Sequence, residues 1–95
     1  MSNTSEGKLS ENLKVQLEKQ YRFQWEPVQD CFVLLYPEGM VQLPGSAGEI
    51  MKRVDGSNTV SQIISDLEAA FPGADLRQDV IEFLEAAYAK GWIRQ

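Results

Sequence analysis

The sequence predicts an α+β domain in which a three-stranded antiparallel sheet is followed by three helices. Residues 21–43 hold three short apolar or alternating segments separated by turn residues. Residues 46–90 hold three longer segments with apolar residues at helical spacing, each bounded by residues that start and stop helices. Strands and helices segregated along a chain are typical of this fold class.

Three segments have the pattern of β-strands. Residues 21–25 alternate aromatic and polar side chains, the period of a half-buried strand. Residues 32–36 form a continuous apolar run whose length and aromatic content favour a strand over a helix. Residues 40–43 return antiparallel after Pro37-Glu38-Gly39, a turn that suits the fixed φ of Pro and a permissive Gly. The shortness of this last segment is typical of an edge strand.

The first two helices carry the spacing of a capping box, in which a hydroxyl and a Glu or Gln three residues later cap each other's backbone. Ser46 and Glu49 have this spacing at the first helix, which Asp55-Gly56 closes. Thr59 and Gln62 have it at the second helix. We therefore expect both helices to begin at these hydroxyl residues.

The third helix is expected to be capped by Asp75 and to run to about Lys90 before Gly91, after Phe71-Pro72-Gly73 has ended the second. Its core stripe is predicted to be Leu76, Val80, Phe83, Leu84 and Ala87.

Residues 1–20 are predicted to be a flexible polar tail, with the domain proper over residues 21–95. Leu9, Leu13 and Leu17 recur at four-residue spacing, which leaves a weak amphipathic helix as an alternative. A tail of this kind could also be a linker to a fused neighbouring domain.

The composition indicates one small acidic domain. The chain has 95 residues, a net charge of −5 and no histidine. A negative balance disfavours nucleic acid and anionic membranes as partners. Cys31 is the single cysteine, which fits a reducing cytoplasm, and no segment has the apolar length of a signal peptide core or a membrane span. We therefore expect a cytoplasmic protein.

The predicted order of elements indicates a winged helix-turn-helix-like domain. Its strands precede its helices, whereas the usual DNA-binding winged helix places its hairpin after them. The residues themselves resemble those of a known family: LLYPEGMVQL at residues 34–43, then Asp55-Gly56, Thr59-Val60, Phe71-Pro72-Gly73 and Gly91-Trp92 are similar to the pyrroloquinoline quinone (PQQ) biosynthesis protein D family, PqqD. The resemblance covers roughly residues 21–95.

This resemblance implies a non-catalytic peptide chaperone without a cofactor. Members of the family bind the ribosomal precursor peptide PqqA and present it to the radical SAM enzyme PqqE. Related domains, called RiPP recognition elements, capture leader peptides by adding them as a strand beside the third strand and packing them on the third helix. An exposed sheet edge is well suited to this mode of binding.

The expected peptide-binding residues lie on these two elements. On the third strand they are Met40, Val41, Gln42 and Leu43, with Met40 and Gln42 facing one way and the other two facing the core or a pocket. On one flank of the third helix they are Arg77, Ile81, Leu84, Glu85 and Tyr88. From the residues alone, the apolar members of both sets could instead be core.

The sequence bears on two other classes of function, a DNA-binding regulator and an enzyme. A winged-helix DNA-binding regulator is the alternative, but the basic residues from Leu76 to the C-terminus are balanced by acidic ones. An enzyme would need a nucleophile and base, or a metal site, and the chain offers one cysteine, no histidine and no dense carboxylate cluster. The sequence therefore predicts binding rather than catalysis, with no metal.

Overall fold

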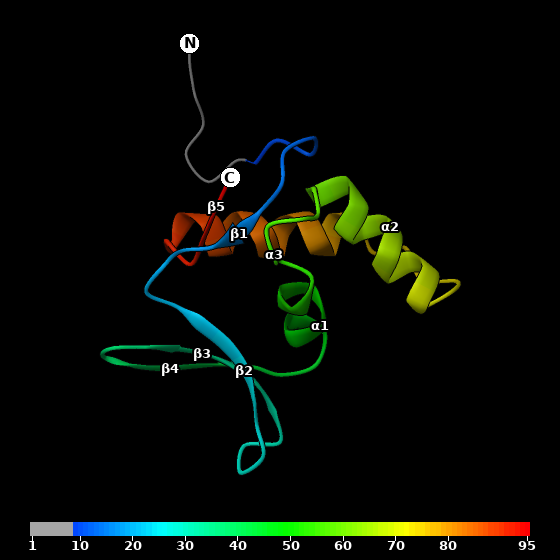
Figure 1. Cartoon of the computed structure of the whole chain (residues 1–95). Helices are drawn as coiled ribbons and strands as arrows, with labels where there is room; N and C mark the ends of the chain where they lie inside the picture. Colours follow the sequence, from blue (N-terminus) through cyan, green and yellow to red (C-terminus); the bar gives the residue numbers. More distant parts are fainter. Residues whose placement is uncertain (1–8) are drawn as a thin grey trace.

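The computed structural model describes residues 9–95. Three strands form one antiparallel sheet in the order β2-β3-β4: Arg22–Glu26, Cys31–Tyr36 and Gly39–Leu43. Three helices follow: α1 at Ser46–Lys52, α2 at Val60–Ala70 and α3 at Arg77–Ala89. In Figure 1, α1 follows β4 directly and lies between the sheet and α3, with α2 to one side. The predicted fold class is confirmed.

The sheet is built from two tight hairpins. Between β3 and β4 the register pairs Tyr36 with Gly39, so the loop is only two residues long. Between β2 and β3, Asp30 takes a φ of 57° and its N–H bonds the carbonyl of Glu26 at 2.8 Å. A residue in the left-handed region at the end of a turn is a normal role for Asp.

Aromatic side chains hold the inner face of the sheet together. Phe32 stacks on Phe23, with ring centroids 4.7 Å apart, and meets the ring of Trp25 edge-on at 5.1 Å. Helix α1 approaches this face closely because Gly48 lacks a side chain. A Cβ there would lie 2.8 Å from the carbonyl oxygen of Leu43 and 2.9 Å from the Phe32 ring.

The helix boundaries partly confirm the predicted caps. The capping box of Thr59 and Gln62 is present at α2. The one predicted at α1 is wrong: Ser46 is already helical, and the N-cap is Gly45 with φ 59° and ψ −129°. Glycine reaches this backbone conformation far more readily than other residues do.

The predicted Asp75 cap of α3 is also wrong. The N-cap is Leu76, without a side-chain cap of its own. The Leu76 N–H instead donates to a carboxylate oxygen of Glu68 on α2, at 3.2 Å. A free N–H at a helix start needs some acceptor, and here it comes from the neighbouring helix.

The predicted tail over residues 1–20 is wrong for its described part, and residues 1–8 lie outside the described residues. Gln16–Leu17 form a strand, β1, which pairs antiparallel with Ile93–Arg94, β5. Val15 is 0% exposed and belongs to the core. Its N–H bonds the carbonyl of Asn58 at 3.0 Å. No helix forms at Leu13 or Leu17, so that alternative is wrong as well.

One apolar core joins all of these elements. Leu34 on the central strand, Met51 on α1, Ile63 on α2 and Leu84 on α3 are all essentially inaccessible to solvent. No buried polar side chain accompanies them among the residues from Leu9 onward. The core is therefore held by apolar contact, and residues far apart in the chain contribute to it.

Val15→Ala should destabilise the domain by about 2 kcal/mol, because it leaves a small cavity in a packed core. Urea unfolding followed by tryptophan fluorescence measures this. Leu13→Ala is the matched control, since Leu13 is exposed and its loss should cost under about 0.5 kcal/mol. Equal midpoints for the two variants would show that the N-terminal segment does not contribute to the core.

Candidate peptide-binding site

Strand β4 is an open edge of the sheet. Its partner is β3 alone, and no strand of the described chain lies on its other side. In the register of this two-residue hairpin, the pairs Tyr36–Gly39, Leu34–Val41 and Phe32–Leu43 exchange hydrogen bonds. The backbone N–H and C=O groups of the two residues between them, Met40 and Gln42, therefore point away from the sheet.

The side chains of β4 divide as predicted. Val41 is half-buried against the core and Leu43 is buried in it. Met40 and Gln42 lie on the outer face, where the Gln42 amide donates to the side-chain oxygen of Gln29. The edge of β4 therefore presents mainly backbone N–H and C=O groups to a partner.

The predicted flank of α3 is only partly accessible. Leu84 is 0% exposed, so its placement in a contact surface is wrong: it faces the core at the centre of the helix. Arg77 forms an ion pair with Glu11 of the N-terminal segment. Ile81 and Glu85 are half-buried, and Tyr88 is 38% exposed. At about 100° per residue, Arg77, Ile81 and Tyr88 lie on the side of the core stripe that faces this segment.

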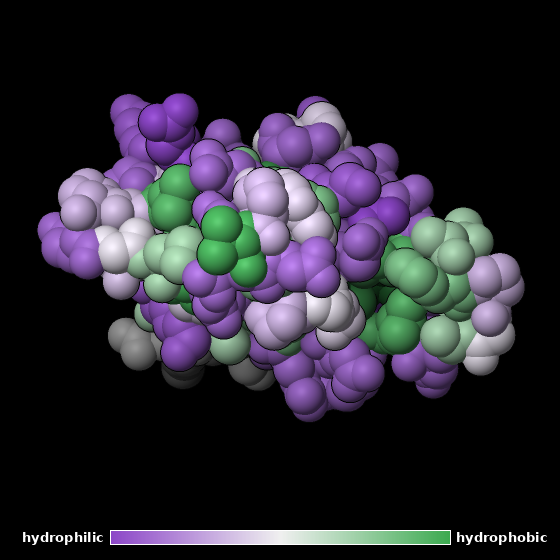
Figure 2. Space-filling view, turned by 90° about the horizontal axis from the view of Figure 1, so that it is seen from below, coloured by the Kyte–Doolittle hydropathy of each residue, from purple (hydrophilic) through white to green (hydrophobic). Residues whose placement is uncertain are grey.

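The opposite side of α3 borders a pocket that the sequence did not predict. The pocket has a volume of about 600 Å³ and lies where the start of α1, the end of α2 and the start of α3 meet. In Figure 2 hydrophobic side chains surround a hollow on the side of the molecule where α2 lies in Figure 1. Its lining residues are Gly45, Ser46, Ala47, Glu49, Ile50, Leu67, Phe71, Leu76, Asp79, Val80 and Phe83.

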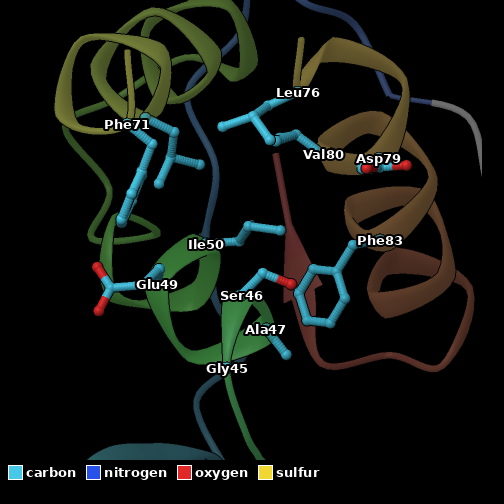
Figure 3. Close-up of a pocket in the computed structure, with 11 residues that line it drawn as sticks. Gly45, Ser46, Ala47, Glu49, Ile50, Phe71, Leu76, Asp79, Val80 and Phe83 are labelled. Atoms are coloured by element: carbon cyan, nitrogen blue, oxygen red, sulfur yellow. The ribbon is translucent and has the colours of Figure 1, made fainter. Parts of the chain in front are cut away.

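The lining is apolar at its centre and acidic at its sides. Figure 3 shows Ile50 reaching inward from α1, Phe71 standing on the α2 side and the Phe83 ring closing the α3 side. Glu49 and Asp79 lie on opposite sides of the opening. The pocket can therefore take an apolar group and place a neighbouring cation near a carboxylate.

Arg53 compensates part of this acidity. Its Nη1 lies 3.1 Å from Glu49 Oε1 and donates to the Glu49 carbonyl at 2.8 Å, while its Nε pairs with Asp66. Partial burial lowers the pKa of Arg53, but the two carboxylates more than offset this and raise it above the ordinary value. Asp79 has no ion-pair partner among residues 9–95.

Other kinds of site find little support in the described residues. No group of three or more His, Cys, Asp or Glu side chains in residues 9–95 is placed to hold a metal ion. Cys31 is buried as a free thiol. The helices of this part of the chain are all too short or too polar to cross a membrane.

The fold of this chain matches that of a solved RiPP recognition element. The solution NMR structure of the PqqD portion of Methylobacterium extorquens PqqCD, described as a functional and stand-alone element of this kind, matches with a TM-score of 0.76. The match is 29% identical and covers 96% of this chain and 100% of that one. Residues 31–93 match the family described as Coenzyme PQQ synthesis protein D (PqqD). The chain belongs to the PqqD family.

Three relatives, each about half identical to this chain, are named PqqA binding protein. The PqqA binding protein of Azotobacter vinelandii is 51% identical over 79 residues, which cover 82% of this chain and 86% of that protein. The PqqA binding protein of Pseudomonas aeruginosa is 53% identical over 78 residues, covering 81% and 85%. That of Stutzerimonas stutzeri is 50% identical over 74 residues, covering 77% and 80%. The predicted resemblance is confirmed.

Leu84→Ala should lower the free energy of unfolding by about 3 kcal/mol, as expected for a large side chain removed from the core. Tyr88→Ala should cost under about 1 kcal/mol because the ring is partly exposed. Thermal and chemical unfolding of the two variants measures the contrast. A Tyr88→Ala protein as unstable as Leu84→Ala would assign Tyr88 to the core.

Proposed function

We propose that this protein binds the precursor peptide PqqA and presents it to the radical SAM enzyme PqqE, without catalysing a reaction itself. The relatives named PqqA binding protein support the choice of peptide. The observation that carries the binding mode is the open edge of β4, which lies within the segment matching the family. We place the complex in the cytoplasm, since a reducing compartment suits a free cysteine.

The peptide is proposed to add to β4 as a fourth strand. Met40 and Gln42 would supply the outward N–H and C=O groups, and such main-chain bonds do not depend on peptide sequence. β2 is the other edge of the sheet, but it lies before the segment that matches the family. The binding contribution of Ile81, Glu85 and Tyr88 remains a prediction of this proposal.

Presentation would act through effective concentration. A peptide held by this domain next to the enzyme meets its active site in an effectively intramolecular encounter. Such a role needs a binding surface and no reactive group.

A DNA-binding regulator remains the weaker candidate. DNA binding draws on a clustered basic surface, and this chain has 14 acidic against 9 basic residues. Two cations near α3 are also engaged: Arg77 with Glu11, and Arg94 with Glu18 at 3.6 Å. No observation favours that reading over the peptide.

A ¹⁵N-HSQC titration with a synthetic PqqA peptide tests the proposal. Saturable shifts at the amides of Met40 and Gln42 and on the helices facing β4 are expected. Shifts on α3 should also show which flank of that helix the peptide contacts, the flank with Tyr88 or the flank with Phe83. A spectrum that stays unchanged at high peptide concentration would overturn the proposed partner.

Gln42→Pro should weaken PqqA binding about tenfold, because it removes an outward N–H that the internal sheet does not use. Gln42→Ala is the matched control: it also loses the side-chain bond to Gln29 but keeps the N–H. Val41→Pro is unsuitable, since in this register the Val41 N–H bonds Leu34 and its loss disturbs the fold. Equal affinities for Gln42→Pro and Gln42→Ala in folded proteins would contradict strand addition at β4.

A further inference from the structure

The pocket between α1, α2 and α3 lies next to the end of the open edge strand. β4 ends at Leu43, and the pocket lining begins two residues later with Gly45, Ser46 and Ala47. We infer that this pocket holds an aromatic or large aliphatic side chain of the bound peptide, placed before the strand-forming segment and beside a basic residue. This inference rests on the proposed function and specifies which part of the peptide gives selectivity.

The apolar lining of the pocket suits a large apolar side chain, and its size leaves room for a neighbouring peptide residue as well. A volume of about 600 Å³ is within the range of sites that enclose small apolar ligands. The walls come from three helices, with Ile50, Leu67 and Val80 at the buried end. Phe71 is 47% exposed and lines this pocket, so an apolar occupant would cover its ring.

The peptide is inferred to run antiparallel to β4, as the strands within this sheet do. All pairs in this sheet are antiparallel, and antiparallel pairs are more common overall. A strand antiparallel to β4 has its N-terminal end near Leu43. Pro44 has no N–H and therefore offers no donor to extend the pairing there. The peptide residues just before the paired segment are thus the ones that reach the opening of the pocket.

The charges at the opening specify the neighbour of the anchoring side chain. Asp79 lines the pocket on one side and has no ion-pair partner in residues 9–95, while Glu49 on the other side is held by Arg53. The chain as a whole is negative. A Lys or Arg next to the apolar residue meets Asp79 favourably, whereas an acidic neighbour is repelled.

The test fills the pocket without removing core contacts. Ser46 is exposed at the first turn of α1, and in Figure 3 its hydroxyl is turned toward Phe83. Ser46→Phe places a ring in the opening, and Ser65→Phe is the matched control on an exposed part of α2 outside this pocket. Isothermal titration calorimetry with synthetic PqqA is expected to show at least tenfold weaker binding for Ser46→Phe and unchanged binding for Ser65→Phe.

Substitutions in the peptide identify which of its residues occupies the pocket. Alanine replacement of one large apolar residue, before the segment that pairs with β4, should weaken binding to the wild type at least tenfold and to Ser46→Phe hardly at all. Asp79→Asn should weaken binding about threefold and reduce its salt dependence. If PqqA binds and shifts the β4 amides but Ser46→Phe binds as the wild type does, the pocket inference fails while the proposed function stands. If PqqA does not bind the wild type, the proposed function itself fails.

Discussion

The structure depends on one apolar core that every element must share. A chain of 95 residues can build a single modest core, and here the central strand, all three helices and both ends of the described chain contribute to it. Leu34 is fully buried on the central strand, where it pairs with Phe23 on β2 and with Val41 on β4. Because the inward side chains form the core, the surfaces available for binding a partner are the open edge of β4 and the pocket between the three helices.

That division explains why the edge of β4 carries little sequence information. Leu43 and Val41 are fixed by packing, while Met40 and Gln42 expose their side chains on the outer face of the sheet. The groups that reach the edge are backbone N–H and C=O, which every residue type but proline supplies. A partner bound there is selected for being extended and flexible enough to pair, and much less for its side chains.

The features that the sequence predicts well are those set by neighbouring residues. The β3–β4 hairpin follows from the predicted turn Pro37-Glu38-Gly39, although Gly39 itself already pairs with Tyr36 as the first residue of β4. The α2 start follows from Thr59 and Gln62, which cap each other across one turn. Features that depend on distant contacts were missed. Val15 stands among polar residues and becomes core only because β1 pairs with β5 at the other end of the chain.

The start of α3 and the pocket show the same limit. Asp75 is a good capping residue by type, yet Glu68 from the preceding helix satisfies the first N–H instead. The pocket is lined by three helices, and its residues share no spacing that a sequence pattern would reveal. Phe83 was predicted as core stripe, and only the packing of α1 against α3 shows that its ring also borders an opening.

Magnitudes indicate that strand addition alone is too weak for selective binding. Two outward residues offer about four hydrogen bonds, each worth about 1 kcal/mol net, against the cost of ordering the peptide. Micromolar affinity needs about 8 kcal/mol. Burying one large apolar side chain adds about 2–3 kcal/mol and, unlike the backbone bonds, depends on which residue is offered. The edge of β4 would then align many peptides, and the pocket beside it would select among them.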